Sequence, residues 1–128
     1  MKLLLDTHLL LWAAVSTARL PTVARQMIED DTNTPMFSVA SVWEVAIKRG
    51  LGRSDFQVDA HLLRRGLLDN GYDEPPILGP HPAAVGALPP IHKDPFDRLP
   101  IAQAVIEGIL LLTVDPVVGR YPAPVRLL

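Results

Sequence analysis

The sequence begins with Met-Lys and continues as LLLDTHLLLW, residues 3–12, where two apolar segments flank Asp6. A short, continuous apolar run such as residues 2–5 is typical of a strand that is covered on both faces of a parallel sheet. The segment LLLWAAV, residues 9–15, has the composition and length of a helix. We therefore expect Asp6 to lie at the junction between a first strand and a first helix.

The same alternation of strand and helix continues along the chain. Further short strands are predicted at residues 36–39, 75–78, 109–114 and 125–128. Helices are predicted at residues 21–30, 41–50, 56–70, 81–88 and 95–108. This order predicts an α/β protein, a three-layer α/β/α sandwich with a mainly parallel sheet of about five strands, in which residues 1–128 form a single domain. Trp12 and Trp43 are expected in its core.

The composition is that of a packed globular protein, with 48% hydrophobic and 20% charged residues in 128. The absence of cysteine excludes disulfides, thiolate catalysis and cysteine-ligated zinc, and it fits a reducing cytoplasm. No apolar run approaches the ~18 residues that a membrane span needs, and no signal-peptide pattern opens the chain. We therefore expect a cytoplasmic protein without membrane contact. A net charge of −2 gives no overall attraction to nucleic acid, so a polyanion would need local positive groups or a metal ion.

Four acidic residues share one kind of position, after a predicted strand or early in a helix: Asp6, Glu44, Asp97 and Asp115. Taken singly, each is explained as a helix cap. Asp6 and Asp115 are candidate N-caps, and segments 41–44 and 94–97 match the capping box, with proline at the first helical position of the second. A cap contributes about 1 kcal/mol and is common, so capping stays open for each acid.

Taken together, the four acids predict a metal site. The carboxyl ends of parallel strands lie side by side, and ligands bind in the crevice outside them. Two carboxylates about 4 Å apart repel each other by about 4 kcal/mol at an effective dielectric constant near 20, so four of them need a cation to stay ionised. Oxygen ligands without cysteine or paired histidine favour Mg²⁺ or Mn²⁺. Such an ion orients a phosphate and lowers the pKa of a coordinated water, which is the chemistry of phosphodiester hydrolysis.

Four segments, in chain order, carry a resemblance to a known family: DTHLLLW, SVASVWEVAIK, DPFDRLPIAQA and LLTVD. Together they resemble PIN-domain ribonucleases, and most closely the VapC toxins of bacterial toxin–antitoxin pairs. The resemblance extends from residue 2 to about residue 121, and its third segment is the most specific. It implies an α/β/α sandwich around a parallel sheet and an endoribonuclease, dependent on Mg²⁺ or Mn²⁺, that cleaves tRNA or ribosomal RNA.

The resemblance also assigns roles to single residues and names partners. It implies that the catalytic and metal-binding residues are Asp6, Glu44, Asp97 and Asp115, with Asp94 as a supporting acid of the DPFDR type. It further implies a homodimer and a cognate antitoxin, whose C-terminal segment packs over the active site.

Three hydroxyl residues are additional candidates. Thr113 lies two residues before Asp115 on the same strand face, where its hydroxyl is placed to hold a metal-bound water, although half-buried strand threonines are common. Ser38 and Thr7 are candidates for hydrogen bonds to the carboxylates, with turn or cap roles as the alternative.

Some features leave alternatives open. Pro100 removes a hydrogen bond inside the last helix and is expected to bend it near Asp97. Arg98 is a candidate phosphate contact, with a solvated position as the alternative, and His92 lies near the site without a ligand spacing. A catalytically inactive PIN-like binding module, acting through its protein partner, is the alternative function.

Other families with an acid after the first strand fit less well. A haloacid-dehalogenase-like phosphatase needs a second aspartate where His8 stands, and a receiver domain needs an aspartate after its third strand, where PPILGP has none. No dinucleotide-binding glycine motif and no P-loop occur.

Overall fold

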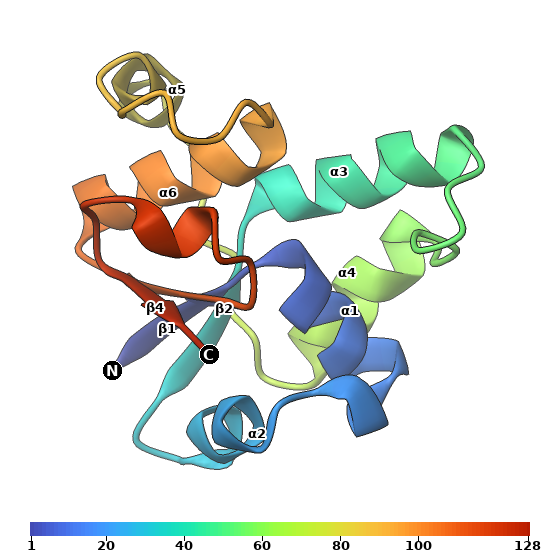
Figure 1. Ribbon diagram of the computed structural model, residues 1–128. Coiled ribbons are helices and arrows are strands. Elements are labelled where there is room, and N and C mark those ends of the chain that lie inside the picture. The colour runs from blue at the N-terminus through green and yellow to red at the C-terminus, as the bar shows by residue number, and fades with distance from the viewer.

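The computed structural model describes residues 1–128 and contains a four-stranded parallel sheet with the strand order β2-β1-β3-β4 (Figure 1). The strands are β1 (Lys2–Leu5), β2 (Thr34–Phe37), β3 (Leu110–Thr113) and β4 (Val125–Leu127). Leu5 lies opposite Phe37 in β2 and opposite Leu112 in β3. These three strands therefore end at nearly the same level, and the residues that follow them gather at one edge of the sheet.

Helices cover both faces of this sheet. They are α1 (Thr7–Val15), α2 (Thr22–Glu29), α3 (Val39–Gly50), α4 (Ala60–Asp69), α5 (Pro80–Val85) and α6 (Pro95–Glu107), with 3₁₀ turns η1 (Thr17–Arg19) and η2 (Val118–Arg120). In Figure 1, α1, α2 and α4 lie on the lower right of the sheet, and α5 and α6 lie above it. None of the helices has the length and apolarity that crossing a bilayer requires.

The leucines of β1 separate the protein interior into two cores. Leu3 and Leu5 belong to the larger core, which includes buried residues of α1 and α4. Leu4 points to the opposite face and packs in a smaller core with Ile101 of α6 and Tyr121. Side chains of a strand alternate between its two faces, so a strand buried on both sides reads as a continuous apolar run. The predicted three-layer sandwich is confirmed.

Local signals at the helix ends explain how the chain reaches this edge of the sheet. Asp6 caps α1 by accepting a hydrogen bond from the Leu9 N–H at 3.0 Å. Asp94 caps α6, with Pro95 at its first position. Gly108 has a φ of +66°, a left-handed conformation that ends α6 and lets the chain enter β3 within two residues.

Two predictions about secondary structure were wrong. Residues 75–78 form no strand, and the only pairing near them is an isolated parallel bridge between Met36 and Asp73, so the sheet has four strands. Pro75 and Pro76 have no N–H to donate to a neighbouring strand. The first turn of α3 also lies earlier than expected: its N-cap is Ser38, so Ser41 and Glu44 form no capping box.

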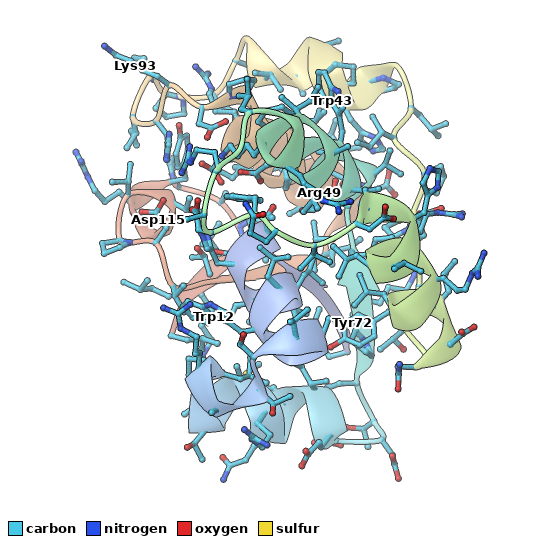
Figure 2. The ribbon with its side chains drawn as sticks, turned by 90° about the vertical axis from the view of Figure 1, so that its right-hand side faces the viewer. Trp12, Trp43, Arg49, Tyr72, Lys93 and Asp115 are labelled. Carbon is cyan, nitrogen blue, oxygen red and sulfur yellow. The ribbon has the colours of Figure 1, made fainter.

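Two further expectations concern bulky and rigid side chains. Trp43 is 54% exposed and lies at the surface of the molecule (Figure 2), so its prediction as a core residue was wrong, whereas Trp12 is half-buried against the larger core. Helix α6 runs without interruption through Pro100, which is buried. Asp97 therefore keeps its place in the first turn of a continuous helix.

Candidate active site

The site is built at the carboxyl ends of the parallel strands. Asp6 follows β1 directly, and Asp115 lies two residues beyond Thr113, the last residue of β3. The Thr113 hydroxyl lies 2.5 Å from Oδ2 of Asp6, to which it donates, and it accepts the Asp115 N–H at 3.0 Å. Thr113 is fully buried. It thus fixes the two acids relative to each other.

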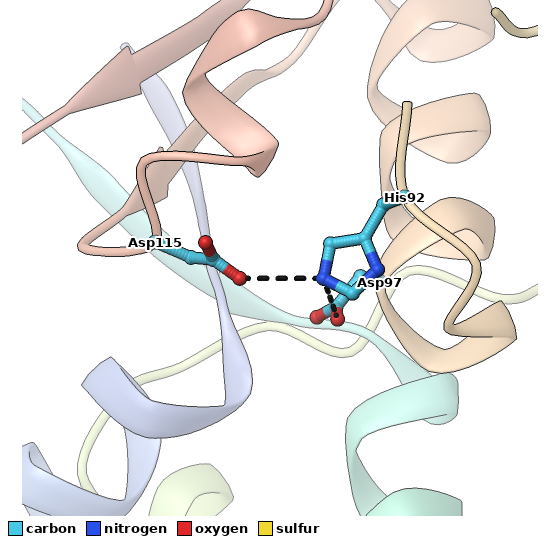
Figure 3. A group of neighbouring side chains, drawn as sticks. All are labelled: His92, Asp97 and Asp115. Carbon is cyan, nitrogen blue, oxygen red and sulfur yellow. Dashed lines mark ion pairs between the residues drawn. The ribbon is translucent and has the colours of Figure 1, made fainter. Parts of the chain in front are cut away.

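Asp97 comes to the same place from the start of α6. His92 Nε2 lies 3.1 Å from Oδ2 of Asp97 and 3.4 Å from Oδ2 of Asp115 (Figure 3). One potential ligand atom from each of these three side chains lies within 4.8 Å of the others. Asp115 also accepts the Val117 N–H at 2.9 Å, so the cap-like role considered for it coexists with its place in this group.

A small pocket joins Asp6 to Asp97. Asp6, Thr7, Phe96 and Asp97 are among the residues that line it, and its volume is about 10 Å³. This is about the room that one water molecule occupies. Asp6, Asp97 and Asp115 are therefore brought together by β1, α6 and the segment after β3, which lie far apart in the sequence.

Glu44 lies beside this group but is already bonded. Its side chain is almost fully buried, with Oε1 accepting a hydrogen bond from the Thr7 hydroxyl at 2.5 Å and Oε2 paired with Lys48. Lys48 Nζ also lies 3.6 Å from Oδ2 of Asp94. Both Glu44 oxygens thus have partners, and a lysine supplies a positive charge among the acids.

Lys48 makes further contacts besides its ion pair with Glu44 in the same helix. Its ammonium group lies 4.9 Å from the ring centroid of Phe56 and 5.7 Å from that of Phe96. Burial alone would lower the pKa of Lys48, but the hydrogen bond to Glu44 and the charges of Glu44, Asp94 and Asp97 outweigh it and raise the pKa. Lys48 therefore stays charged and links α3 to the start of α6.

The surroundings of Asp97 disfavour its ionised form. The pKa of Asp97 is raised to about 7 by burial first and then by the charges of Asp94, Glu44 and Asp115, which together outweigh the lowering effect of His92. Burial also raises the pKa of Asp6, against the lowering effect of its hydrogen bond from Thr113. Carboxyl groups in this state bind a divalent cation well, because the cation replaces the proton. The oxygen ligands present thus fit Mg²⁺ or Mn²⁺.

The supporting residues differ in what they contact. Thr7 bonds to Glu44, whereas the Ser38 hydroxyl accepts the Ala40 N–H at 3.1 Å as the cap of α3. Asp94 caps α6 through Oδ1 and faces Lys48 through Oδ2. Arg98 neither extends into solvent nor faces the acids: it donates to the carbonyl oxygens of Val85, the last residue of α5, and of Leu88.

His92 was expected only near the site, and the structure places it between two of the acids. It has no partner at the regular spacing of a metal motif, and it lies in the proline-rich loop before α6. The sequence does carry one signal, its position two residues before the Asp94 cap. That spacing lets the ring turn back toward the helix start, where the Asp94 N–H donates to Nδ1 at 3.1 Å.

The PIN-domain family model matches residues 3–123 of the sequence. This chain belongs to the PIN-domain family. PIN domains are generally nucleases that use a divalent metal, and the acidic group around Asp97 offers this PIN domain oxygen ligands for one. No curated protein matches the sequence significantly.

Two solved structures share the fold of this PIN domain. One is VapBC2 from Rickettsia felis, bound to a DNA fragment from its promoter, with a TM-score of 0.72, 15% identity, and coverage of 99% of this chain and 98% of that chain. The other is VapBC-1 from nontypeable Haemophilus influenzae, with a TM-score of 0.61, 14% identity, and coverage of 91% and 88%. At these identities the likeness concerns the fold.

Proposed function

We propose that residues 1–128 form one PIN-like domain that acts as a Mg²⁺- or Mn²⁺-dependent endoribonuclease, the toxin of a toxin–antitoxin pair in the cytoplasm. The observation that carries the proposal is the placement of half-buried Asp97: its carboxylate shares a pocket with Asp6, and His92 Nε2 lies 3.1 Å from it and 3.4 Å from Asp115. These surroundings raise the pKa of Asp97 to about 7. Such a group is typical of a functional site rather than of a stabilising one.

Asp6, Asp97 and Asp115 are the proposed direct ligands. Both oxygens of Glu44 already have partners, Thr7 and Lys48, so we do not place it among the direct ligands. We propose instead that Glu44 holds a metal-bound water or a second ion beside them. When bound, the metal would supply Lewis acidity at the phosphate and lower the pKa of a coordinated water. Thr113 keeps Asp6 oriented, and we expect hydrolysis to leave 5′-phosphate and 3′-hydroxyl ends.

The arginines of the chain favour a metal as the source of positive charge. Three of them on or near α3 and α4 are paired with acids on the surface: Arg49 with Asp59, Arg53 with Asp55, and Arg64 with Glu74. Beside the acids, Lys48 is itself paired with Glu44. We therefore propose that a phosphate bound at the acids depends on the cation.

A large groove supports the proposed antitoxin partner. It lies between α1, α2 and α4, has a volume of about 600 Å³, and is lined mostly by apolar residues, among them Val15, Leu20, Ile28 and Leu62. An apolar segment of a partner protein would cover it. The similar solved structures come from VapBC complexes, and the VapC-like sequence pattern implies an antitoxin.

A second surface supports the proposed homodimer. Four exposed residues follow one another at intervals of four along α3 and its C-cap: Val39, Trp43, Ile47 and Leu51. Residues at this spacing form one face of a helix, and a helix face that is apolar is usually covered by another helix. A second copy of the chain would cover it.

The alternative function is a catalytically inactive PIN-like binding module. Lys48 favours it, because a lysine that pairs with Glu44 and approaches Asp94 neutralises part of the acid cluster without a metal. In that case the groove between α1, α2 and α4 would be the functional surface, and the acids would serve to cap and join helices.

Mapping of cleavage ends on total RNA tests the proposal. We expect purified protein to cut RNA in Mn²⁺, to leave 5′-phosphate ends, and to be silenced by a chelator. Asp97→Asn should abolish cleavage while the circular dichroism spectrum stays that of the wild type. Wild-type protein that cleaves no RNA across a titration of both metals would instead favour the binding module.

A further inference from the structure

His92 occupies an anchored position between the two acids. Its ring lies between the loop before α6 and the segment after β3, with Nε2 within ion-pair distance of both Asp97 and Asp115 (Figure 3). Its backbone N–H donates to the hydroxyl of buried Tyr121 at 2.7 Å. The loop that carries the imidazole is thus fixed to the smaller core.

The hydrogen bonds of the ring define where its proton is. Nδ1 of His92 accepts the Asp94 N–H at 3.1 Å, so this nitrogen presents a lone pair. In a neutral imidazole the proton is then on Nε2, which becomes the donor. Nε2, which then carries the proton, lies 3.1 Å from Oδ2 of Asp97 and 3.4 Å from Oδ2 of Asp115.

This tautomer conflicts with a role as metal ligand. To ligate a metal, Nε2 must present its lone pair, so the ring proton would have to be on Nδ1. The Nδ1–H would then point at the Asp94 N–H. Two donors would then face each other at the start of α6. As a donor, by contrast, His92 occupies Oδ2 of Asp97 and leaves Oδ1 available to a cation.

We propose that His92 is a positioning residue: a fixed Nε2–H donor that holds the Asp97 and Asp115 carboxylates side by side and is not itself a metal ligand. The inference rests on the proposed nuclease function for its role in turnover. Groups that orient metal ligands in this way typically change metal affinity or activity by about 10–100-fold when they are removed.

The tautomer is measured directly by ¹⁵N NMR of the histidine rings in the RNA-free wild-type protein near pH 8, with His92→Gln to assign the signal. We expect the Nε2–H form without metal, and the same form when Mg²⁺ is saturating. An Nδ1–H form, or a switch to it on adding Mg²⁺, would overturn the proposal. This readout does not depend on RNA cleavage.

Turnover provides the second readout. In saturating Mn²⁺, His92→Ala should lower kcat for RNA cleavage by about tenfold or more and leave KM within about twofold, and His92→Gln, which keeps an amide donor, should recover most of the rate. The exposed His61, changed to Ala, is the matched control and should cleave as the wild type does. If the wild type is active and the His92→Ala variant is equally active, the proposed role of His92 is refuted but the nuclease function is not. A wild type that never cleaves refutes the nuclease function, and the NMR result still decides between donor and ligand.

Discussion

The Thr113 hydroxyl donates to Oδ2 of Asp6 at 2.5 Å and so joins the end of β3 to the end of β1 across 107 positions of sequence. The oxygen of the Thr113 hydroxyl also accepts the Asp115 N–H. One buried hydroxyl therefore serves two of the proposed metal ligands.

Thr113→Val keeps the shape of this side chain and removes both hydrogen bonds. Because the Asp6 carboxylate and the Asp115 N–H lose a partner, we expect the free energy of unfolding to fall by about 1–2 kcal/mol, or the Tm by about 4–8 °C. Thr113→Ser, which keeps the hydroxyl, should lose less than half as much. A valine variant as stable as the wild type in a thermal melt would show that the two hydrogen bonds of Thr113 do not contribute to the stability of the fold.

Asp97→Asn is expected to stabilise the metal-free protein near pH 8. The folded-state pKa of about 7 lies above the ordinary value of 3.8, so the wild type loses stability as the pH rises from about 4 to about 7, and the whole penalty is present above that. Removing it should raise the free energy of unfolding by at least about 1 kcal/mol. Denaturant melts should show this difference shrinking toward about pH 4, whereas a difference that is constant with pH would contradict the raised pKa.

The affinity for Mn²⁺ should depend on pH through the same carboxyl group. A protonated Asp97 is not available as a ligand for the metal ion. As the pH rises toward 7, the apparent Kd for Mn²⁺ should therefore fall by up to about tenfold per pH unit, and above pH 7 it should level off. Isothermal titration at several pH values measures this. In Asp97→Asn the remaining affinity should be weak and lack this step; an unchanged pH profile in that variant would assign the titration to another group.

Lys48→Met tests the ion pair within α3. It leaves the buried Glu44 carboxylate without its cation, and breaking such a pair lowers the free energy of unfolding by about 3–5 kcal/mol when burial is complete. Lys48 is 15% exposed, so we expect about 2–4 kcal/mol. The double variant Lys48→Met/Glu44→Gln should recover at least half of the loss, and a purely additive double-mutant cycle would argue against coupling.

The sequence was informative wherever a local pattern determines the outcome. Asp6 and Asp115 were placed correctly beside the sheet because they directly follow apolar strands, and parallel strands end together. The cap at Asp94 followed from the proline after it. The helix after β2 was harder, since Ser38 and Ser41 are both good caps, and the tertiary structure uses the earlier one.

Contacts between distant segments were not accessible in the same way. His92 meets Asp115 only because Tyr121 anchors the proline-rich loop, and no local periodicity encodes that contact. Lys48 fits an ordinary pair with Glu44, and its approach to Asp94 depends on how α3 packs against α6. The strand at residues 75–78 was wrongly predicted from apolar content alone. The two prolines there lack the N–H groups that pairing with a neighbouring strand requires.

The central claim is that the acids around Asp97 form a divalent-cation site, and an anomalous-difference map of Mn²⁺-soaked crystals tests it most directly. We predict one strong peak about 2.1 Å from carboxylate oxygens of Asp97 and Asp115, with Asp6 facing it and His92 outside its ligands. A map with no peak at these residues in saturating Mn²⁺, with Lys48 still paired with Glu44 and His92 still in contact with Asp97 and Asp115, would contradict the account.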